Sequence, residues 1–401
     1  MWLWLAGAAS AFVESTLARF GRCAARKAVP RWLPTISSRL GKRWVGVLFA
    51  VLLIICYAYG FNGAGFQLAN ALGITFPTTP PTARLLLWAV LLLTAFVIFG
   101  GSKRISIITS IVVPVMALAY IGLGLFITFT NLDQLPAVFA YIGESAFDFQ
   151  SIFGGFAGSV VVLGIKRGLF SNEAGMGSAP NAAATASVSH PVKQGLVQSL
   201  SVYIDTLIVC TCSAFMVLIF YVQSGGTFGE LNGMPLVQMA VNSAVGEMGI
   251  HFVTFAIFAF AFSSLIGNYF YAESNIRFIK NSPVVRTIFR ITCLVAIMVG
   301  CLNNFTLAWN FADITMGFMA IVNLIAILLL GKWAFKALDD YTAQKKAGKD
   351  PVFVADSIEG MPATQCWHIG SDDLKDVGPQ PVKEYFEEAI DAGGDSFEPA
   401  K

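Results

Sequence analysis

The segment GIKRGLFSNEAGMGSAP, residues 164–180, follows directly on an apolar run and brings charge to its end: Lys166, Arg167 and Glu173. Ionisable side chains at membrane depth are costly, and where they occur they usually serve a function. The same segment holds residues that weaken a continuous helix, namely Gly164, Gly168, Gly175, Gly177 and Pro180. We therefore expect a membrane helix that is broken within this segment.

Composition indicates the class of protein. Of the 401 residues 56% are hydrophobic and only 12% are charged, and the mean hydropathy is +0.68. A soluble domain does not have this composition. The sequence predicts an all-α integral membrane protein with the lipid bilayer as its surroundings and no nucleic-acid partner.

Nine apolar stretches are long enough to cross about 30 Å of hydrocarbon. They lie at 1–19, 44–72, 83–100, 105–130, 150–169, 195–222, 249–272, 286–303 and 311–331. The loop at 19–43 carries many basic residues and no acidic one, so the positive-inside rule predicts that it is cytoplasmic. Alternate counting then places the other basic loops on the same side. We expect a multi-pass protein of the plasma membrane, with its amino end outside and its carboxyl end in the cytoplasm.

The chain divides by composition into two parts. Residues 1–335 read as a polytopic membrane domain, and residues 336–401 as a cytoplasmic tail. From Lys332 onward charges and glycines increase and apolar runs become rare. We expect this tail to be solvated and poorly ordered.

The intramembrane charges have two readings. In one, Lys166, Arg167 and Glu173 pair with each other and hold a bent helix in place. In the other, the break exposes backbone groups that bind a carboxylate, an ammonium group or Na⁺, and this reading is favoured. Asp205 lies within the span that follows residue 195, and we expect it to neutralise Lys166 or Arg167 across the bundle as a structural ion pair.

Hydroxyl and amide side chains within spans are also ambiguous. Ser263 and Ser264 either bond carbonyls of their own helix or offer oxygens to a hard cation such as Na⁺. Gln67 and Asn62 either bind a small polar ligand or join neighbouring helices. The residues alone leave both alternatives open.

The motif GIKRGLFSNEAGMGSAPNAAATA, with HP at 190–191, YIDT at 203–206, FSSLIGNYFYAE at 262–273 and WNFAD at 309–313, resembles the sodium:alanine (alanine or glycine:cation) symporter family. The resemblance implies a LeuT-type inverted-repeat helical bundle in which Na⁺ entry drives the uptake of alanine, glycine or a similar small neutral amino acid. It implies no enzymatic reaction and no cofactor apart from Na⁺ as the coupling ion. Proton coupling through Glu173, Asp205 or Glu273 is the minority expectation.

The resemblance also implies roles for individual residues. Gly168, Phe170 and Ser171 of the broken helix would lie beside the substrate, and Gln67 is similar to a substrate-contacting glutamine. Ser263 and Ser264 would supply oxygens to Na⁺. Asn268 would close the pocket and influence the size of substrate that fits.

The chain departs from the family pattern at its beginning. The resemblance implies a first core helix with a G-T-G-N-type break, which residues 1–401 do not show, so we expect the chain to correspond to an N-terminally truncated member. A local reading-frame slip would explain the divergent residues 21–38. The alternative function is accordingly an inactive truncated remnant or an assembly partner of an intact transporter. An intramembrane enzyme is disfavoured because the sequence contains neither HExxH nor GxSxG.

Overall fold

The computed structural model describes residues 3–20, 42–59, 80–100, 102–146, 164, 167–168, 170–229, 231, 233–302, 305–361 and 367. The regular structure of these residues is entirely helical. Helices satisfy their own backbone hydrogen bonds, as the interior of a bilayer requires. The all-α prediction is therefore confirmed for the described part of the chain.

The elements run in chain order from the amino end to the start of the tail. They are α1 (Leu3–Phe20), α3 (Arg43–Ile54), η1 (Ile55–Tyr59), α5 (Pro80–Phe99), α6 (Ser102–Thr130), η3 (Leu132–Gln134), α7 (Leu135–Ala146), α10 (Ala179–Ala183), α11 (Pro191–Tyr203), η4 (Ile204–Val209), α12 (Cys210–Gln223), α13 (Gly233–Val245), α14 (Glu247–Ile279), α15 (Pro283–Leu302), α16 (Phe305–Lys346) and η5 (Ala355–Ser357).

Four helical segments within the described residues are both long and apolar enough to cross a membrane. They are Thr109–Thr130, Pro191–Gln223, Glu247–Ile279 and Asn310–Lys346, each of which overlaps a predicted crossing. The predicted crossing at 150–169 lies mostly outside the described residues, as does much of the one at 44–72. The multi-pass character of the chain is thus supported, while the count of nine and the LeuT-type arrangement stay predictions.

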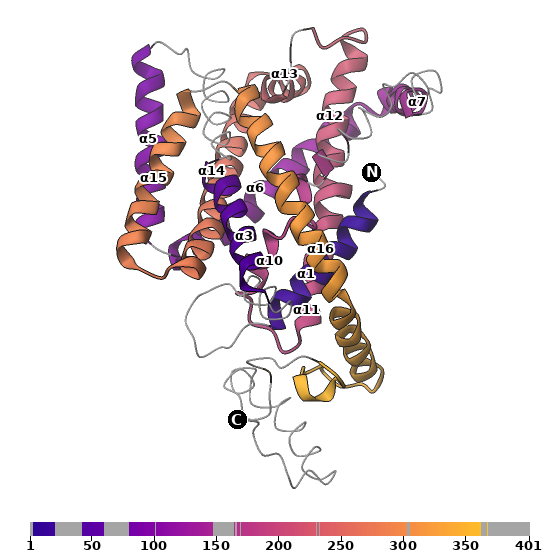
Figure 1. Ribbon diagram of the computed structural model, residues 1–401. Coiled ribbons are helices and arrows are strands. Elements are labelled where there is room, and N and C mark those ends of the chain that lie inside the picture. The colour runs from indigo at the N-terminus through magenta and orange to yellow at the C-terminus, as the bar shows by residue number, and fades with distance from the viewer. Residues whose placement is uncertain are drawn as a thin grey trace, which may run out of the picture.

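Figure 1 shows how the helices are arranged. Helices α5 and α15 run side by side at one edge of the bundle, and α6 and α12 pack together toward the other edge. Helix α1 lies against α11 and α16 near the centre. The short helices α7 and α13 lie at the end of the bundle opposite the end of α16.

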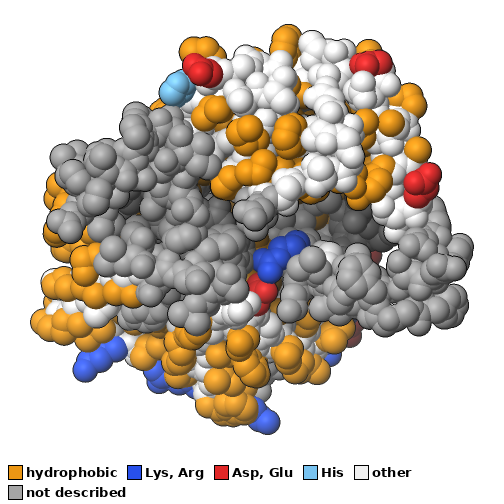
Figure 2. All heavy atoms as spheres, turned by 90° about the horizontal axis from the view of Figure 1, so that it is seen from above, with side chains coloured by type: hydrophobic (Ala, Val, Ile, Leu, Met, Phe, Trp, Pro, Cys, Tyr) orange, Lys and Arg blue, Asp and Glu red, His pale blue; other side chains and the backbone are white. Residues whose placement is uncertain are grey.

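The largest group of packed apolar side chains lies among α1, α3 and α16 and includes Phe49, Leu53 and Met319. Many other large apolar side chains are exposed, including Leu328 on α16 at 81% and Leu118 on α6 at 71%. Seen from the end of the bundle that carries α7 and α13, apolar side chains cover much of the described surface and acidic ones are few (Figure 2). The exposed apolar side chains along α6 and α16 are those expected on helices that face lipid.

The tail differs from its prediction over its first part. Helix α16 continues through Lys346, and the side chains of Val352, Phe353 and Val354 are buried. Trp367 is also buried, at 1% exposure. The described part of the tail is thus helical to Lys346 and buried at 351–355 and at Trp367, while most side chains from 339 to 350 are exposed; the division into a membrane domain and a cytoplasmic tail stays a prediction. The physical reason is a local apolar run, at 352–354, that packs onto the helix ends above it.

Candidate functional site

The predicted break is present at residues 173–178, between the helical residues 170–172 and α10. Glu173, Gly175 and Gly177 have φ values of 51°, 78° and 78°. Only glycine adopts this left-handed conformation at little cost. A Cβ atom on Gly177 would also lie 2.5 Å from both Asn323 Oδ1 and Phe49 Cζ. The backbone conformation therefore favours glycine at 175 and 177, and at Gly177 the lack of space requires it as well.

One buried carboxylate holds the freed backbone of the break. Glu14 of α1 is fully buried, and it accepts the N–H groups of Gly175 at 3.3 Å and Gly177 at 3.2 Å. Asn323 of α16 donates to Glu14 Oε2 and to the carbonyl of Gly175, each at 2.9 Å. A broken helix leaves such groups without intrahelical partners. Glu14 and Asn323 supply those partners and tie the break to α1 and α16.

The other side of the break contacts the π-helical turn η4. Ser171 donates to Asp205 Oδ2 at 2.5 Å, and Asn172 donates to Thr206 Oγ1 at 2.9 Å. A π-helical turn inside a helix frequently marks a functional position. The region before the break is thus fixed by side chains of η4, as the region after it is fixed by Glu14.

The expected ion pair between Arg167 and Asp205 is not formed. Arg167 instead forms an ion pair with Asp313 of α16, with a separation of 2.9 Å. Asp205 accepts hydrogen bonds from Ser171 and, at 3.9 Å, from Cys210 Sγ. The reason is geometric: Asp205 faces the end of the helical segment at Ser171, while Arg167 is one turn earlier and reaches α16. Lys166, the other expected partner, lies outside the described residues.

A cavity of about 410 Å³ lies beside the break, between α6, α10 and α14. Its α14 wall consists of residues spaced as one face of a helix: Ser263, Ser264, Gly267, Asn268, Phe270 and Tyr271. Glu173 lines it from the break, and Thr109 from α6. The volume is within the range of about 300–1,000 Å³ that is typical of small-molecule sites.

Asn268 gives this cavity an unused donor. The side chain is only 5% exposed, and its Nδ2 atom has no hydrogen-bond partner within the described structure. Leaving a buried amide N–H without a partner costs about 1–3 kcal/mol. A bound ligand that accepts this hydrogen bond would recover that free energy.

The two serines behave differently from each other. Ser263 Oγ donates to the carbonyl of Phe260 at 2.9 Å, three residues back in its own helix, and its oxygen lone pairs can still face a ligand. Ser264 is exposed on the cavity wall. The own-helix reading of the sequence thus applies to Ser263 without removing it from the cavity.

The predicted site residues therefore fall into groups. Glu173, Ser263, Ser264 and Asn268 meet at one cavity. Ser171 faces Asp205, Gly168 accepts a hydrogen bond from Asn172 through its carbonyl, and Phe170 packs on the apolar core, so these three belong to the helical segment before the break. Gln67 lies outside the described residues.

Two residues of this region were missed by sequence reasoning. Asn323 interrupts the apolar run of the last predicted span, and an amide in such a run is itself a signal of a helix contact. Asp313 ends the WNFAD motif, and it could have been matched to Arg167 as the nearest intramembrane acid of that helix. Glu14 likewise interrupts the apolar run of the first predicted span, but the sequence does not reveal its partners.

The chemistry of the cavity is that of a binding site for a small polar solute. The described residues contain no group of three or more His, Cys, Asp or Glu side chains that could hold a metal ion. They do place the carboxyl group of Glu173, the hydroxyls of Ser263 and Ser264 and the amide of Asn268 around one volume. Such oxygens suit a hard monovalent cation, and the donor and carboxyl suit the two ends of an amino acid.

The sequence profile described as the sodium:alanine symporter family matches residues 1–355. The chain belongs to this family. It is therefore a cation-coupled amino-acid symporter, and Na⁺ is the coupling ion of the family. Transport without covalent chemistry agrees with the solute-binding character of the cavity.

Relatives with assigned names support the same conclusion. The amino-acid carrier protein AlsT of Bacillus subtilis is 43% identical over 373 residues, which cover 91% of this chain and 78% of the relative. The probable sodium/glutamine symporter GlnT of the same organism is 44% identical over 375 residues, 92% of this chain and 77% of the relative. The sodium/proton-dependent alanine carrier protein of Bacillus sp. strain PS3 is 37% identical over 394 residues, which cover 92% of this chain and 86% of the relative.

Proposed function

We propose that this symporter couples Na⁺ entry to the uptake of alanine, glycine or a similarly small neutral amino acid across the plasma membrane. The observation that carries the proposal is the buried amide donor of Asn268, without a partner in the described structure, beside Ser263, Ser264 and Glu173 in one cavity. The relative named as an alanine carrier supports this choice of substrate. The amino end lies outside and the carboxyl end in the cytoplasm, as the distribution of basic loops indicates.

Each side chain of the cavity has a role in this proposal. Asn268 donates to the substrate carboxylate, and the carboxyl group of Glu173 accepts from its ammonium group. Ser263 and Ser264 contribute hydroxyl oxygens to Na⁺. A cation beside a carboxylate lowers the cost of bringing both into a low-dielectric interior, which makes the binding of Na⁺ and substrate cooperative.

The remaining predicted contacts complete the site as part of the proposal. Gly168, Phe170 and Ser171 approach the substrate from the helical segment before the break, and Gln67 does so from the second predicted span. In the described arrangement Ser171 donates to Asp205, so contact with a substrate requires this hydroxyl to exchange its partner.

Uptake by the purified protein in liposomes tests the function. An inward Na⁺ gradient is expected to drive accumulation of labelled alanine above the external concentration, whereas an equal K⁺ gradient is not. Replacing Ser263 and Ser264 together by alanine should raise the Na⁺ concentration for half-maximal uptake about 30-fold, since two lost oxygen contacts on the order of 1 kcal/mol each sum to about 2 kcal/mol. An active double variant with unchanged Na⁺ dependence would remove the serines from the ion site.

Proton coupling is the second candidate. Glu173 lines the cavity, and the relative from Bacillus sp. is named as sodium/proton-dependent. An inward proton gradient without Na⁺ distinguishes the two: accumulation of alanine under that gradient supports proton coupling, and its absence in a protein that responds to Na⁺ contradicts it.

A further inference from the structure

The first part of the tail packs against the ends of three membrane helices. Residues 351–361 together with Trp367, here called the strap, contact the end of α1, the start of α11 and the last turns of α16. Phe353 is fully buried and Val352 is 2% exposed. These strap side chains belong to the same apolar cluster as Met176 of the break and Ala184 just after α10.

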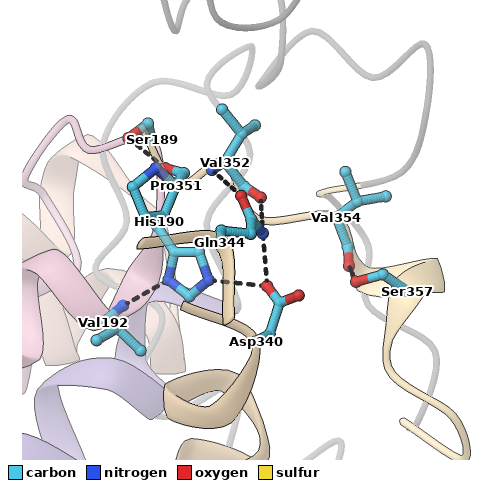
Figure 3. A network of polar contacts seen from close by, with 9 residues as sticks. All are labelled: Ser189, His190, Val192, Asp340, Gln344, Pro351, Val352, Val354 and Ser357. Atoms are coloured by element: carbon cyan, nitrogen blue, oxygen red, sulfur yellow. Dashed lines mark hydrogen bonds and ion pairs between the residues drawn. The ribbon is translucent and has the colours of Figure 1, made fainter. Parts of the chain in front are cut away.

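Paired hydrogen bonds attach the strap to the segment before α11. The N–H of Phe353 donates to the carbonyl of Ser189 at 3.0 Å, and the hydroxyl of Ser189 donates to the carbonyl of Pro351 at 3.0 Å. Gln344 of α16 donates to the carbonyl of Val352 and accepts its N–H, each at 2.9 Å. Figure 3 shows the contact of Ser189 with Pro351 and those of Gln344 with Val352.

His190 links the same elements beneath the strap. Its Nδ1 accepts the N–H of Val192 at 3.2 Å, which caps α11, and its Nε2 faces Asp340 Oδ2 at 3.2 Å (Figure 3). The ring also lies edge-on to Phe353 and to Tyr341, with centroids 5.1 Å apart in each case. The strap thus covers a buried imidazole that orients the start of a membrane helix.

A second line of contacts leads from the strap to the cavity. Trp367 Nε1 donates to the carbonyl of Arg19 at 3.1 Å, and the guanidinium group of Arg19 lies over the indole ring at 5.2 Å. Arg19 also donates to the carbonyl of Ala184 at 3.4 Å. The next residue, Thr185, lines the cavity, as does Ala182. Only one side chain therefore separates the strap from the chain segment that forms the cavity wall.

The strap is attached by buried apolar side chains and, at its edge, by a few polar contacts. At the rim, Lys193 pairs with Asp350 at 2.7 Å, and Lys336 donates to the carbonyl of Glu359 at 2.9 Å, both in exposed positions. Exposed pairs of this kind contribute little stability. Detachment of the strap therefore costs mainly the exposure of its buried apolar side chains, and no membrane helix has to unfold for it.

We propose that the strap is a gate that closes the transport pathway at this end of the bundle and must detach in each cycle before the amino acid can leave the cavity. The inference rests on the proposed function, because a gate has meaning only in a transporter. This end carries the basic loops and is the predicted cytoplasmic end. The strap therefore holds the closed state of the inner side, and its release accompanies movement of α1 away from Ala184.

A reversible tether tests the proposal without disturbing folding. Lys193→Cys with Asp350→Cys, in a protein whose seven native cysteines are replaced, places two exposed thiols at the rim. A cleavable bifunctional thiol reagent is added after reconstitution, and alanine uptake is measured before tethering, after tethering and after reduction. We expect uptake to fall at least tenfold on tethering and to recover on reduction, while Na⁺-dependent alanine binding changes less than twofold. Each single-cysteine variant with the same reagent is the control.

Uptake within twofold of the untethered protein, with the cross-link verified, would overturn the gate. Absence of uptake before tethering would instead contradict the proposed function, and a second measurement then still tests the strap. Ala184 is 2% exposed, so a thiol introduced there by Ala184→Cys should react slowly with a maleimide. Phe353→Ala in the same protein should speed that reaction at least fivefold. The exposed strap variant Glu359→Ala should leave this rate unchanged. An unchanged rate in Phe353→Ala would also overturn the gate.

Discussion

At the scale of single residues, Glu14 determines the shape of the broken segment. Its two oxygens accept two backbone N–H groups and one amide donor, so every hydrogen bond at this carboxylate depends on acceptor oxygens. Glu14→Gln replaces one of them by an N–H₂ donor. Leaving a buried N–H without an acceptor costs about 1–3 kcal/mol, so we expect the initial rate of alanine uptake to fall about tenfold or more.

The control for this variant is Glu144→Gln, on an exposed position of α7, which should transport at the wild-type rate. Equal uptake by Glu14→Gln and Glu144→Gln, at equal amounts of reconstituted protein, would show that the carboxylate does not hold the break.

Gly177 allows a second prediction at this scale. Gly177→Ala combines a backbone strain of about 1–3 kcal/mol with a Cβ atom placed 2.5 Å from Asn323 and Phe49 side-chain atoms. We expect a clear fall in the melting temperature of the detergent-solubilised protein. Gly317→Ala, whose Cβ meets nothing within 4 Å, is the control and should melt at or above the wild-type temperature. Equal melting of the two variants would contradict the geometry of the break.

At the scale of elements, much of the candidate site was predictable from local sequence. The break follows from glycines and charges within one segment, and the α14 wall follows from helical spacing: Ser263, Gly267 and Tyr271 lie four residues apart on one face. The partners of these elements were not predictable. Whether Arg167 meets Asp205 or Asp313 depends on how α11 and α16 pack around the break, and this information is not local.

In the tail, composition hid local structure that the sequence contains. The polar composition of the tail predicts a poorly ordered segment, yet the three consecutive apolar side chains from Val352 to Val354 are buried. Composition averaged over seventy residues concealed this run. The contacts of Trp367 with Arg19 could not be anticipated, because they join residues 348 positions apart.

The cap of α11 predicts a dependence on pH. Burial lowers the pKa of His190 below its ordinary value, and the nearby charge of Lys193 lowers it further, while Asp340 acts in the opposite direction. The rings of Tyr341 and Phe353 pack on the imidazole and exclude water from it. Because the folded-state pKa lies below the unfolded value of about 6.5, the neutral ring stabilises the docked strap above that pH. Stability is lost as the pH falls below it, since protonated Nδ1 cannot accept from Val192.

We therefore expect tryptic cleavage near Lys345 and Lys349 to accelerate between pH 6.5 and 5.5 relative to a pH-matched standard protein. His190→Asn can still accept the N–H of Val192 but does not titrate, so its cleavage rate should not vary with pH in this range. The same pH profile in both proteins would assign the effect to another group.

At the scale of the whole molecule, the break lines the cavity and is held on both sides by other helices. Helices α1 and α16 hold the break through Glu14 and Asn323, and η4 holds the residues before it through Asp205 and Thr206. The last turn of α1 also contacts the strap, where the carbonyl of Arg19 accepts a hydrogen bond from Trp367. A movement of α1 would therefore change the break and the strap together, which is the coupling that alternating access requires.

The dissociation constant of alanine for the purified protein, measured in saturating Na⁺, shows whether the amino acid binds in the cavity lined by Asn268. Asn268→Leu keeps a similar side-chain size but removes the donor. Loss of a hydrogen bond to a charged group, about 1.5–3 kcal/mol, predicts a dissociation constant raised about 10- to 150-fold. The matched control is Asn242→Leu on α13, which does not line the cavity and should bind as the wild type does. An Asn268→Leu protein that is folded and binds alanine with wild-type affinity would contradict the account.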